Sequence, residues 1–352
     1  MLPKKDPRNY LVVFSQFGYK LIVMVLVGFI GLGTLAGCGS SIKNQIVVYN
    51  GQHLELTQAL ASGFERESGI KVKLESNSSV VLADQVISEG KRSPADVVFF
   101  ENSPELMVLE QKGLLAKLPS STLVQVPPQY SSPSSEWVGV ALRVNCLVYN
   151  PKKISASQLP TSILQLANPM WKGKIAIAPS DPDFLPLVGA VAKEYRAPEA
   201  KAWLEGLKKN AAIFQSDEAV TVAVNNGSYS VGIVNQYYWY RLEKEVGSKN
   251  MASKIYYFPA GNIGSLENVS GIAVLKGSSN YKEAVKFIDY VVSRTGQEVI
   301  SGDDDFEYPA RVGVEPNKSL TPLDRVHPFT MSVVTLGTDQ LASNLLQQIG
   351  LL

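Results

Sequence analysis

Residues 96–104 read DVVFFENSP, a run in which a predicted strand passes into a predicted helix. The Val and Phe residues at 97–100 favour a buried strand, because β-branched and aromatic side chains pack well in sheets. Ser103 and Pro104 favour a helix start, since serine caps helices and proline is accepted at the first helical position. Glu101 follows the strand directly. A strand, a polar residue at its end and then a helix form the repeating unit of an α/β fold.

The same alternation of strands and helices continues on both sides of this run. Short apolar runs predict strands at 46–49, 70–74, 138–148, 175–177, 229–234 and 272–275. Apolar residues at helical spacing predict helices at 56–64, 81–90, 186–193, 198–210, 237–246 and 281–293. We therefore expect a parallel sheet with helices on both faces, and a chain of this length is expected to form two such units.

The N-terminal segment has the pattern of a secretory signal. It begins with basic residues, continues with an uncharged run at 21–37 and ends in Leu-Ala-Gly directly before Cys38. Small residues before a cysteine resemble the lipobox of bacterial lipoproteins, in which the cysteine carries lipid. The alternative is an uncut anchor, although a run of 17 residues is short for a membrane span. We expect residues 1–37 to be a signal peptide, residues 38–44 to be a linker, and lipid on Cys38 to anchor the exported protein on the outer face of the cytoplasmic membrane.

Cysteine content and charge exclude two classes of protein. Besides Cys38 the chain has one cysteine, Cys146, in an apolar strand-like run. A disulfide framework or a zinc site built on cysteines is therefore excluded, and a buried, inert thiol is expected. Removal of residues 1–37 takes away four basic residues and one acidic residue, which changes the formal net charge from +1 to −2. A nearly neutral surface argues against nucleic-acid binding.

Four residues of metal-binding type lie just past predicted strands. They are His53, Glu101, Tyr237 and Tyr238. In open α/β sheets ligands bind beyond the carboxyl ends of the strands, so these side chains are expected to meet. Imidazole suits several transition metals, whereas a phenol, with a pKa of about 10, must lose its proton to bind strongly. A trivalent cation drives that loss, which makes ferric iron the natural ligand of this set.

Several pieces of the chain are similar to the ferric-iron-binding receptors of bacterial ABC importers. The matching pieces are VYNGQH at 48–53, FERESGIKV at 64–72, PADV at 94–97, WKGKI at 171–175, NQYYW at 235–239 and NVSG at 268–271. The NGQH turn and the YYW run are the most specific of these. The other pieces also occur in relatives that bind thiamine, phosphonates or polyamines, so they support the fold more than the ligand.

The resemblance implies a two-lobed periplasmic-binding-protein fold with a ligand cleft between the lobes. Residues 45–139 and 268–315 would form lobe 1 and supply His53 and Glu101 as ligands, whereas residues 140–267 and 316–352 would form lobe 2 and supply Tyr237 and Tyr238. Metal binding would close the lobes about hinges near 139–142 and 263–268. The resemblance also implies a monomer that delivers Fe(3+) to the permease and ATPase of an ABC importer.

One part of the chain departs from the family pattern. Many members complete the iron coordination with a bound anion, which is held by a turn after the strand following Trp-Lys-Gly. Here that turn reads SDPD at 180–183, whose aspartates repel phosphate and whose proline lacks a backbone N–H. Asn235 matches a family asparagine, but Asp217 falls where another is expected. We therefore expect carbonate rather than phosphate, with Arg143, Asp181 and Asn235 as auxiliary residues, or else a protein carboxylate or water in place of the anion.

Three other functions compete with iron transport. The same receptor fold binds thiamine, a polyamine or a phosphonate in relatives, in pockets built from aromatic cages or anion nests. A hydrolase is not expected, because the chain has two histidines and neither a Gly-x-Ser-x-Gly nor a His-Glu-x-x-His motif. A purely structural lipoprotein would not need ligand-type residues at strand ends. Tyr49 and Tyr308 are weaker candidates for phenolate ligands, His327 is interpreted as structural, and residues 303–305 are interpreted as a solvated loop.

Overall fold

The fold is built on a ten-stranded sheet within the described residues, 44–302 and 304–352, of the computed structural model. Eight strands follow the order β2-β1-β3-β9-β4-β7-β5-β6, and β8 and β10 both pair with β4. The strands are β1 (Gln45–Gly51), β2 (Lys71–Ser76), β3 (Val97–Phe100), β4 (Trp137–Tyr149), β5 (Ile175–Ile177), β6 (Ala211–Ile213), β7 (Val231–Asn235), β8 (Lys254–Tyr256), β9 (Glu267–Val274) and β10 (Tyr308–Pro309). The predicted signal sequence and Cys38 lie outside the described residues.

The strand directions differ from the parallel sheet expected from the sequence. β1 is parallel to β2 and β3, and β5 is parallel to β6 and β7. Between these two parallel groups, β9 is antiparallel to β3 and β4, and β4 is antiparallel to β7. The prediction of a parallel sheet is therefore wrong for the centre of the sheet, because alternating strands and helices do not specify the direction of the strands that join two groups.

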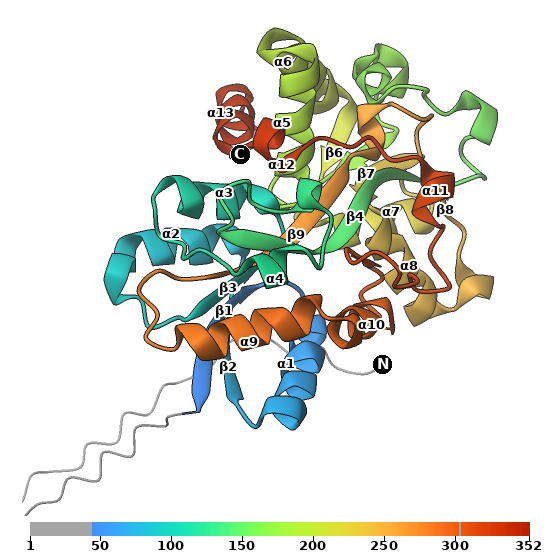
Figure 1. Cartoon of the computed structure of the whole chain (residues 1–352). Coiled ribbons are helices and arrows are strands. Elements are labelled where there is room, and N and C mark those ends of the chain that lie inside the picture. The colour runs from blue at the N-terminus through green and yellow to red at the C-terminus, as the bar shows by residue number, and fades with distance from the viewer. Residues whose placement is uncertain (1–43, 303) are drawn as a thin grey trace, which may run out of the picture. The chain divides into compact units, whose positions relative to one another are not determined.

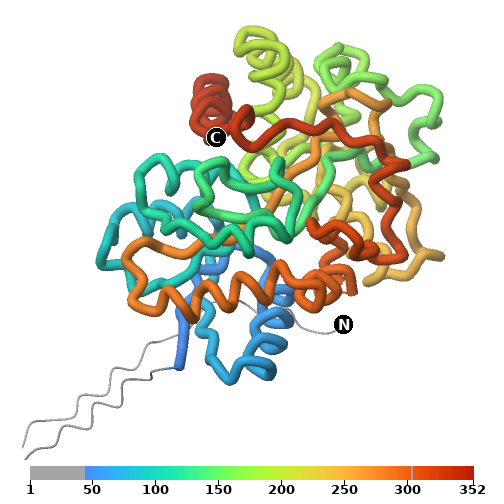
Figure 2. The backbone as a smooth tube through the Cα atoms, in the orientation of Figure 1, coloured from blue at the N-terminus to red at the C-terminus, as the bar shows by residue number. Residues whose placement is uncertain are grey.

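Helices cover the parallel groups. They are α1 (Leu54–Ser68), α2 (Ser79–Glu89), α3 (Ser103–Gln111), α4 (Ser120–Leu123), α5 (Phe184–Tyr195), α6 (Ala197–Asn210), α7 (Asp217–Asn225), α8 (Gln236–Val246), α9 (Tyr281–Val292), α10 (Arg294–Gly302), α11 (Leu323–Val326), α12 (Val333–Leu336) and α13 (Gln340–Ile349). Figure 1 shows α2 and α3 on one side of the group formed by β1, β2 and β3, and α1 and α9 on the other. In Figure 2 the red segment of α13 runs beside the yellow-green segment of α5 and α6, although these elements are far apart in the sequence.

Local sequence signals explain where the helices begin and end. The run at 96–104 forms β3 and the start of α3, with Pro104 in the first turn of the helix. The side chain of Ser78 accepts a hydrogen bond from the Val81 N–H at the start of α2, which satisfies one of the unpaired amides there. Gly69 ends α1 in the left-handed region, with φ of 70°, and its N–H donates to the Glu65 carbonyl. The sequence predicted this end at Gly69.

Strand β4 connects the two parallel groups. Its first part, from Trp137 to Val144, pairs with β9, and its last part, from Asn145 to Tyr149, pairs with β7. The pairing with β9 shifts register between Gly139 and Ala141, as in a β-bulge. The two groups are therefore joined by a continuous strand rather than by a flexible linker.

The apolar core is divided in the same way. One cluster of buried side chains covers β1, β3, β9 and the first part of β4, together with α1, α2 and α9. Strands β5 and β7 are buried along their whole length, so both faces are covered, because successive strand residues point to opposite sides. Ile175 and Ile177 lie in the cluster that includes α5, α6 and α13, whereas Ala176 and Ala178 lie with Cys146 in a third cluster against α7. The prediction of a buried Cys146 is confirmed.

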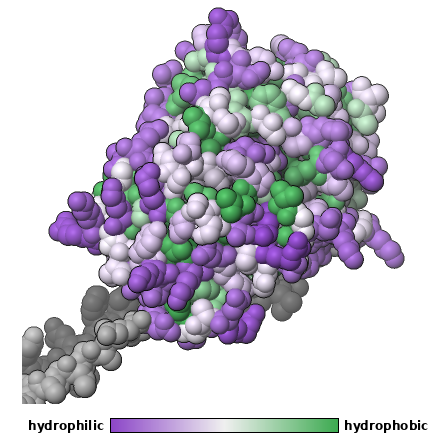
Figure 3. Space-filling view, in the orientation of Figure 1, coloured by the Kyte–Doolittle hydropathy of each residue, from purple (hydrophilic) through white to green (hydrophobic). Residues whose placement is uncertain are grey.

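The surface shows where the remaining apolar side chains lie. On the face in Figure 3 they form several separate patches between hydrophilic side chains. Among residues 44–302 and 304–352, none of the helices combines the length and the apolar character that a membrane crossing requires.

Candidate metal centre

Three strand ends place the predicted ligands together. Gly51 at the end of β1 pairs with Phe100 at the end of β3, so the residues that follow both strands emerge at one edge of the sheet. His53 directly precedes α1, and Glu101 directly follows β3. Tyr237 lies in the first turn of α8, which begins directly after β7. The edge predicted from the sequence is therefore the place where these side chains meet.

The donor atoms of these residues form a continuous chain of contacts. His53 Nε2 lies 3.1 Å from Glu101 Oε1, and the same carboxylate oxygen lies 3.0 Å from the Tyr237 hydroxyl oxygen. The ring of His53 meets the Tyr237 ring edge-on, with centroids 4.9 Å apart. The Tyr238 ring packs against that of Tyr237, with centroids 4.2 Å apart. An imidazole, a carboxylate and two phenols thus share one site.

Arg143 lies at the base of this site with no exposed surface. Its Nη1 lies 2.8 Å from Glu307 Oε1 and 4.0 Å from Glu101 Oε1, and its Nη2 donates to Asn102 Oδ1 at 2.9 Å. Its Nε lies 3.4 Å from Asp183 Oδ1. Three carboxylates therefore surround the guanidinium, although its Nε makes no hydrogen bond within the described part of the chain.

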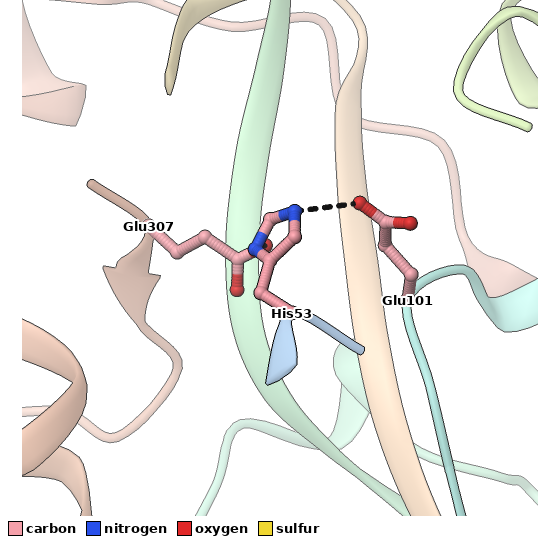
Figure 4. A group of neighbouring side chains, drawn as sticks. All are labelled: His53, Glu101 and Glu307. Carbon is pink, nitrogen blue, oxygen red and sulfur yellow. Dashed lines mark ion pairs between the residues drawn. The ribbon is translucent and has the colours of Figure 1, made fainter. Parts of the chain in front are cut away.

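Sequence reasoning missed the second carboxylate that faces the histidine. Figure 4 shows His53 between Glu101 and Glu307. Glu307 is fully buried, accepts a hydrogen bond from Gln52 Nε2 at 3.1 Å and has Oε1 3.7 Å from His53 Nδ1. That nitrogen has no hydrogen-bond partner among the described residues. The sequence did contain a signal, because Glu307 lies between Phe306 and the apolar residues 308–310. A carboxylate in such a stretch is buried when the stretch packs inside the protein.

The aspartate run predicted to be a solvated loop is not solvated at Asp305, and residue 303 lies outside the described residues. Asp305 is buried, lies 3.7 Å from His53 Nδ1 and forms an ion pair with Arg241. The guanidinium carbon of Arg241 lies 4.8 Å from the centroid of the Tyr237 ring. The prediction was wrong for Asp305, because a long-range contact with α8 was not visible in a run of acidic residues. Asp304, by contrast, is largely exposed and pairs with Lys244.

The acidic turn at 180–183 lies against the same site. Asp183 is buried, and its Oδ2 lies 2.6 Å from the Tyr237 hydroxyl oxygen. Asp181 accepts backbone N–H groups of Asp183 and Asp217, at 3.1 and 2.9 Å. Carboxylate oxygens of these three aspartates lie within 4.8 Å of one another. Asn235 is also fully buried, and both polar atoms of its side chain lack a hydrogen-bond partner in the described part of the chain.

The two weaker tyrosine candidates use their hydroxyls elsewhere. The Tyr49 hydroxyl contacts both carboxylate oxygens of Glu89, at 3.0 and 3.1 Å. The Tyr308 hydroxyl donates to the Thr321 carbonyl at 2.6 Å. These contacts leave Tyr237 and Tyr238 as the phenols beside His53 and Glu101.

Comparison with known proteins places this chain in a family. The family model described as bacterial extracellular solute-binding protein matches residues 50–298. The chain belongs to this family. This solute-binding protein is 35% identical over 313 residues to the "Fe(3+)-binding periplasmic protein" of Serratia marcescens, a match that covers 89% of this chain and 92% of that one. It is 36% identical over 311 residues to the "Major ferric iron-binding protein" of Neisseria meningitidis serogroup B, covering 87% and 93% of the two chains.

A solved structure has the same fold as this solute-binding protein. The iron-bound HitA of Pseudomonas aeruginosa superimposes with a TM-score of 0.84 at 38% sequence identity. The match covers 87% of this chain and 99% of that one. The expected two-lobed α/β fold is therefore confirmed.

The centre of this solute-binding protein contains more acidic than basic side chains. The carboxylates at the site are Glu101, Asp181, Asp183, Asp217, Asp305 and Glu307. The guanidinium groups among them are those of Arg143 and Arg241. Buried carboxylates in excess of cations are unfavourable unless they are protonated or bind a further cation. Burial and the neighbouring carboxylates raise the pKa of Asp181 to about 7 and that of Asp217 well above its ordinary value, so the centre holds part of its acidic groups as neutral acids, and a bound cation would favour their ionised forms.

The pKa directions follow from this arrangement. Burial raises the pKa of Glu101, but the charges of Arg143 and His53 outweigh burial and lower it to about 2. Burial lowers the pKa of His53, but the adjacent Glu101 carboxylate more than compensates and raises it. Burial, together with the charge of Asp183, raises the pKa of Tyr237 and of Tyr238 well above the ordinary phenol value. Without a cation, both phenols therefore keep their protons at neutral pH.

Proposed function

We propose that this solute-binding protein captures ferric iron outside the cytoplasm and delivers it to an ABC importer. The proposal rests on one observation above all: His53 Nε2, Glu101 Oε1 and the Tyr237 hydroxyl oxygen follow one another at 3.1 and 3.0 Å in an acid-rich, buried site. The names of the relatives from Serratia marcescens and Neisseria meningitidis support the same ligand.

The proton balance of the phenols favours a trivalent cation. Tyr237 and Tyr238 bind a metal strongly only as phenolates, and burial beside Asp183 makes loss of their protons unfavourable in the empty site. A trivalent ion supplies enough positive charge to displace both protons, as bound zinc does with a thiol. Iron binding should release protons, so the iron affinity should rise with pH.

The four ligands come from both predicted lobes. We propose that residues 45–139 and 268–315 form the lobe that carries His53 and Glu101, and that residues 140–267 and 316–352 form the lobe that carries both tyrosines. Iron binding selects the closed arrangement because only that arrangement brings all four ligands together. Strand β4 changes partner from β9 to β7 between Val144 and Asn145, slightly beyond the predicted hinge at 139–142.

The receptor is proposed to act as a lipid-anchored monomer rather than as an enzyme. The family consists of extracellular solute-binding proteins, which supports export and a permease and ATPase as partners. Lipid on Cys38 would hold the protein on the outer face of the cytoplasmic membrane. Replacement of Cys38 by alanine should move the protein from the membrane fraction to the soluble fraction; continued sedimentation with membranes would contradict the anchor.

A visible absorption titration tests the iron proposal. The part from residue 39 to residue 352, which contains the compact described unit, is titrated with chelated ferric iron. Charge transfer from phenolate to iron should produce a salmon-red band. Tyr237→Phe and Tyr238→Phe should each weaken the band and lower the affinity, because each removes one phenolate ligand.

Tyr240→Phe is the matched control for this titration. Tyr240 lies on the same helix and is buried, but its hydroxyl contacts Thr321 rather than the metal centre. The control should therefore keep the band. A wild-type protein that stays colourless and binds no iron would refute the proposal and point to an organic cation or a phosphonate as the ligand.

A further inference from the structure

The acidic turn at 180–183 brings a carboxylate, that of Asp183, into contact with the predicted ligand Tyr237. We propose that Asp183 is itself a ligand of the ferric ion, so that the protein holds iron without a bound anion. This inference rests on the function proposed above. It adds a protein carboxylate to His53, Glu101, Tyr237 and Tyr238, which leave part of a six-coordinate sphere unfilled.

The spacing of the donor atoms carries the inference. Asp183 Oδ2, the Tyr237 hydroxyl oxygen, Glu101 Oε1 and His53 Nε2 are separated in turn by 2.6, 3.0 and 3.1 Å. Neighbouring donors of an octahedral ion with bonds of about 2.0–2.1 Å lie about 2.9 Å apart. The Tyr237 oxygen therefore has a carboxylate oxygen on each side at the spacing of an adjacent ligand, Glu101 Oε1 on one side and Asp183 Oδ2 on the other.

Asp183 is held in place by its other polar atoms. Its Oδ1 lies 3.3 Å from Asn102 Nδ2 and 3.4 Å from Arg143 Nε, and its backbone N–H donates to Asp181. The residue has almost no exposed surface. These contacts fix the carboxylate so that Oδ2 faces the Tyr237 hydroxyl. A carboxylate supported in this way is a preorganised metal ligand.

Metal binding replaces the proton that Asp183 and Tyr237 share. In the structure the Tyr237 hydroxyl donates to Asp183 Oδ2. When ferric iron enters, bonds form from iron to the Tyr237 oxygen and to Asp183 Oδ2, the O–H bond of Tyr237 breaks, and its proton leaves to solvent. The iron charge then neutralises both oxygens, and no oxidation or reduction is involved.

The surroundings of Asp183 also exclude an added anion. A phosphate beside Tyr237 would have to lie against the carboxylates of Asp181, Asp183 and Asp217, whose oxygens lie within 4.8 Å of one another. The backbone N–H groups of the turn are also committed: that of Asp181 donates to the Ala178 carbonyl at 3.0 Å and that of Asp183 donates to Asp181 Oδ1 at 3.1 Å. Pro182 has no backbone N–H, so residues 181–183 of the turn offer no free backbone donor with which to hold an anion.

The test is an iron titration in buffer freed of phosphate, carbonate and citrate, with a competing chelator to set the affinity. The wild-type protein should bind iron with its full charge-transfer band, and millimolar carbonate or phosphate should change neither the band nor the affinity. Asp183→Asn should lose about 100-fold or more in affinity, since loss of a ligand exceeds the effect of a supporting residue. Added carbonate should restore part of this loss.

Glu105→Gln is the matched control. Glu105 is a buried carboxyl group in the first turn of α3, and it lies outside the chain of donor atoms. The same exchange of acid for amide should leave the iron affinity and its independence of anions unchanged. A loss as large as that in Asp183→Asn would show that any nearby buried acid matters, and would overturn the assignment.

An infrared difference spectrum tests the ligand directly. In protein carrying isotopically labelled aspartate, iron should shift an aspartate carboxylate band in the wild type, and this shift should be missing in Asp183→Asn, which separates Asp183 from the nearby Asp181, Asp217 and Asp305. An unshifted band would overturn the inference, as would a wild-type protein that requires an added anion, while the function proposed above would stand. A wild-type protein that binds no iron under any condition would overturn both.

Discussion

Replacing Arg143 by methionine removes the positive charge at the base of the metal centre while keeping a long, unbranched side chain. The guanidinium lies 2.8 Å from Glu307, 3.4 Å from Asp183 and 2.9 Å from Asn102, and no part of it is exposed. Loss of one partner of a buried ion pair costs about 3–5 kcal/mol, because the remaining charge stays buried without compensation. We expect a loss of this size in the free energy of unfolding of the iron-free protein.

Urea unfolding measures this loss, and ferric iron supplies a second measurement. Because iron would neutralise the Glu101 and Asp183 carboxylates that face Arg143, the difference between variant and wild type should shrink when both are loaded with iron. Arg294→Met is the control, since Arg294 is exposed and pairs with Glu298 at 3.7 Å; such pairs contribute at most about 1 kcal/mol. The reasoning fails if Arg143→Met matches this control, or if iron leaves the deficit unchanged.

Three further predictions concern residues away from the metal. Burial raises the pKa of Glu267 to about 6, against the lowering effect of the hydrogen bond from Tyr130, so the folded protein favours the neutral acid. The stability that this group contributes is present below its ordinary pKa of about 4.3 and is lost as the pH rises through about 6. Above pH 6 the unfolding free energy of Glu267→Gln, measured with urea, should therefore exceed that of the wild type by about 2 kcal/mol. At pH 4 the two proteins should not differ. A Cβ on Gly206 would lie 2.4 Å from Ala167 Cβ and 2.7 Å from its Cα, so Gly206→Ala should lower the unfolding free energy by about 1–3 kcal/mol, and an unchanged urea midpoint would refute this. Burial raises the pKa of the Cys146 thiol, so the folded part from residue 39 to residue 352 should not react with a thiol reagent, and one thiol should appear on unfolding.

The sequence was most informative where the site is local to a strand end. His53, Glu101 and Tyr237 each follow a strand within a few residues, and a parallel pair brings two of these ends to one edge. Their meeting could therefore be predicted from strand positions alone. The ends of α1 and β3 were predictable for a similar reason, because glycine and the Ser103-Pro104 pair are local signals.

The rest of the site depends on contacts between distant segments. Arg143 was open to interpretation as a surface residue, because a strand pattern does not reveal that β4 is covered on both faces by other parts of the chain. Glu307 reaches the site through β10, which pairs with β4 across more than 150 residues of sequence. Asp183 was predicted to repel an anion, but its hydrogen bond with Tyr237 depends on how α5 and α8 are placed. No local periodicity encodes these placements.

The position of β9 has a consequence for the order in which the chain is made. β9 lies between β3 and β4 in the sheet, yet more than a hundred residues of sequence separate the end of β4 from the start of β9. A chain synthesised from its N-terminus thus presents β3 and β4 with open edges until residues 267–274 have been added. The first half of the protein cannot complete its sheet while the second half is still being translated. A chain that cannot complete its sheet during synthesis has not yet reached its final fold. An unfolded chain is the form that passes through a narrow translocation channel.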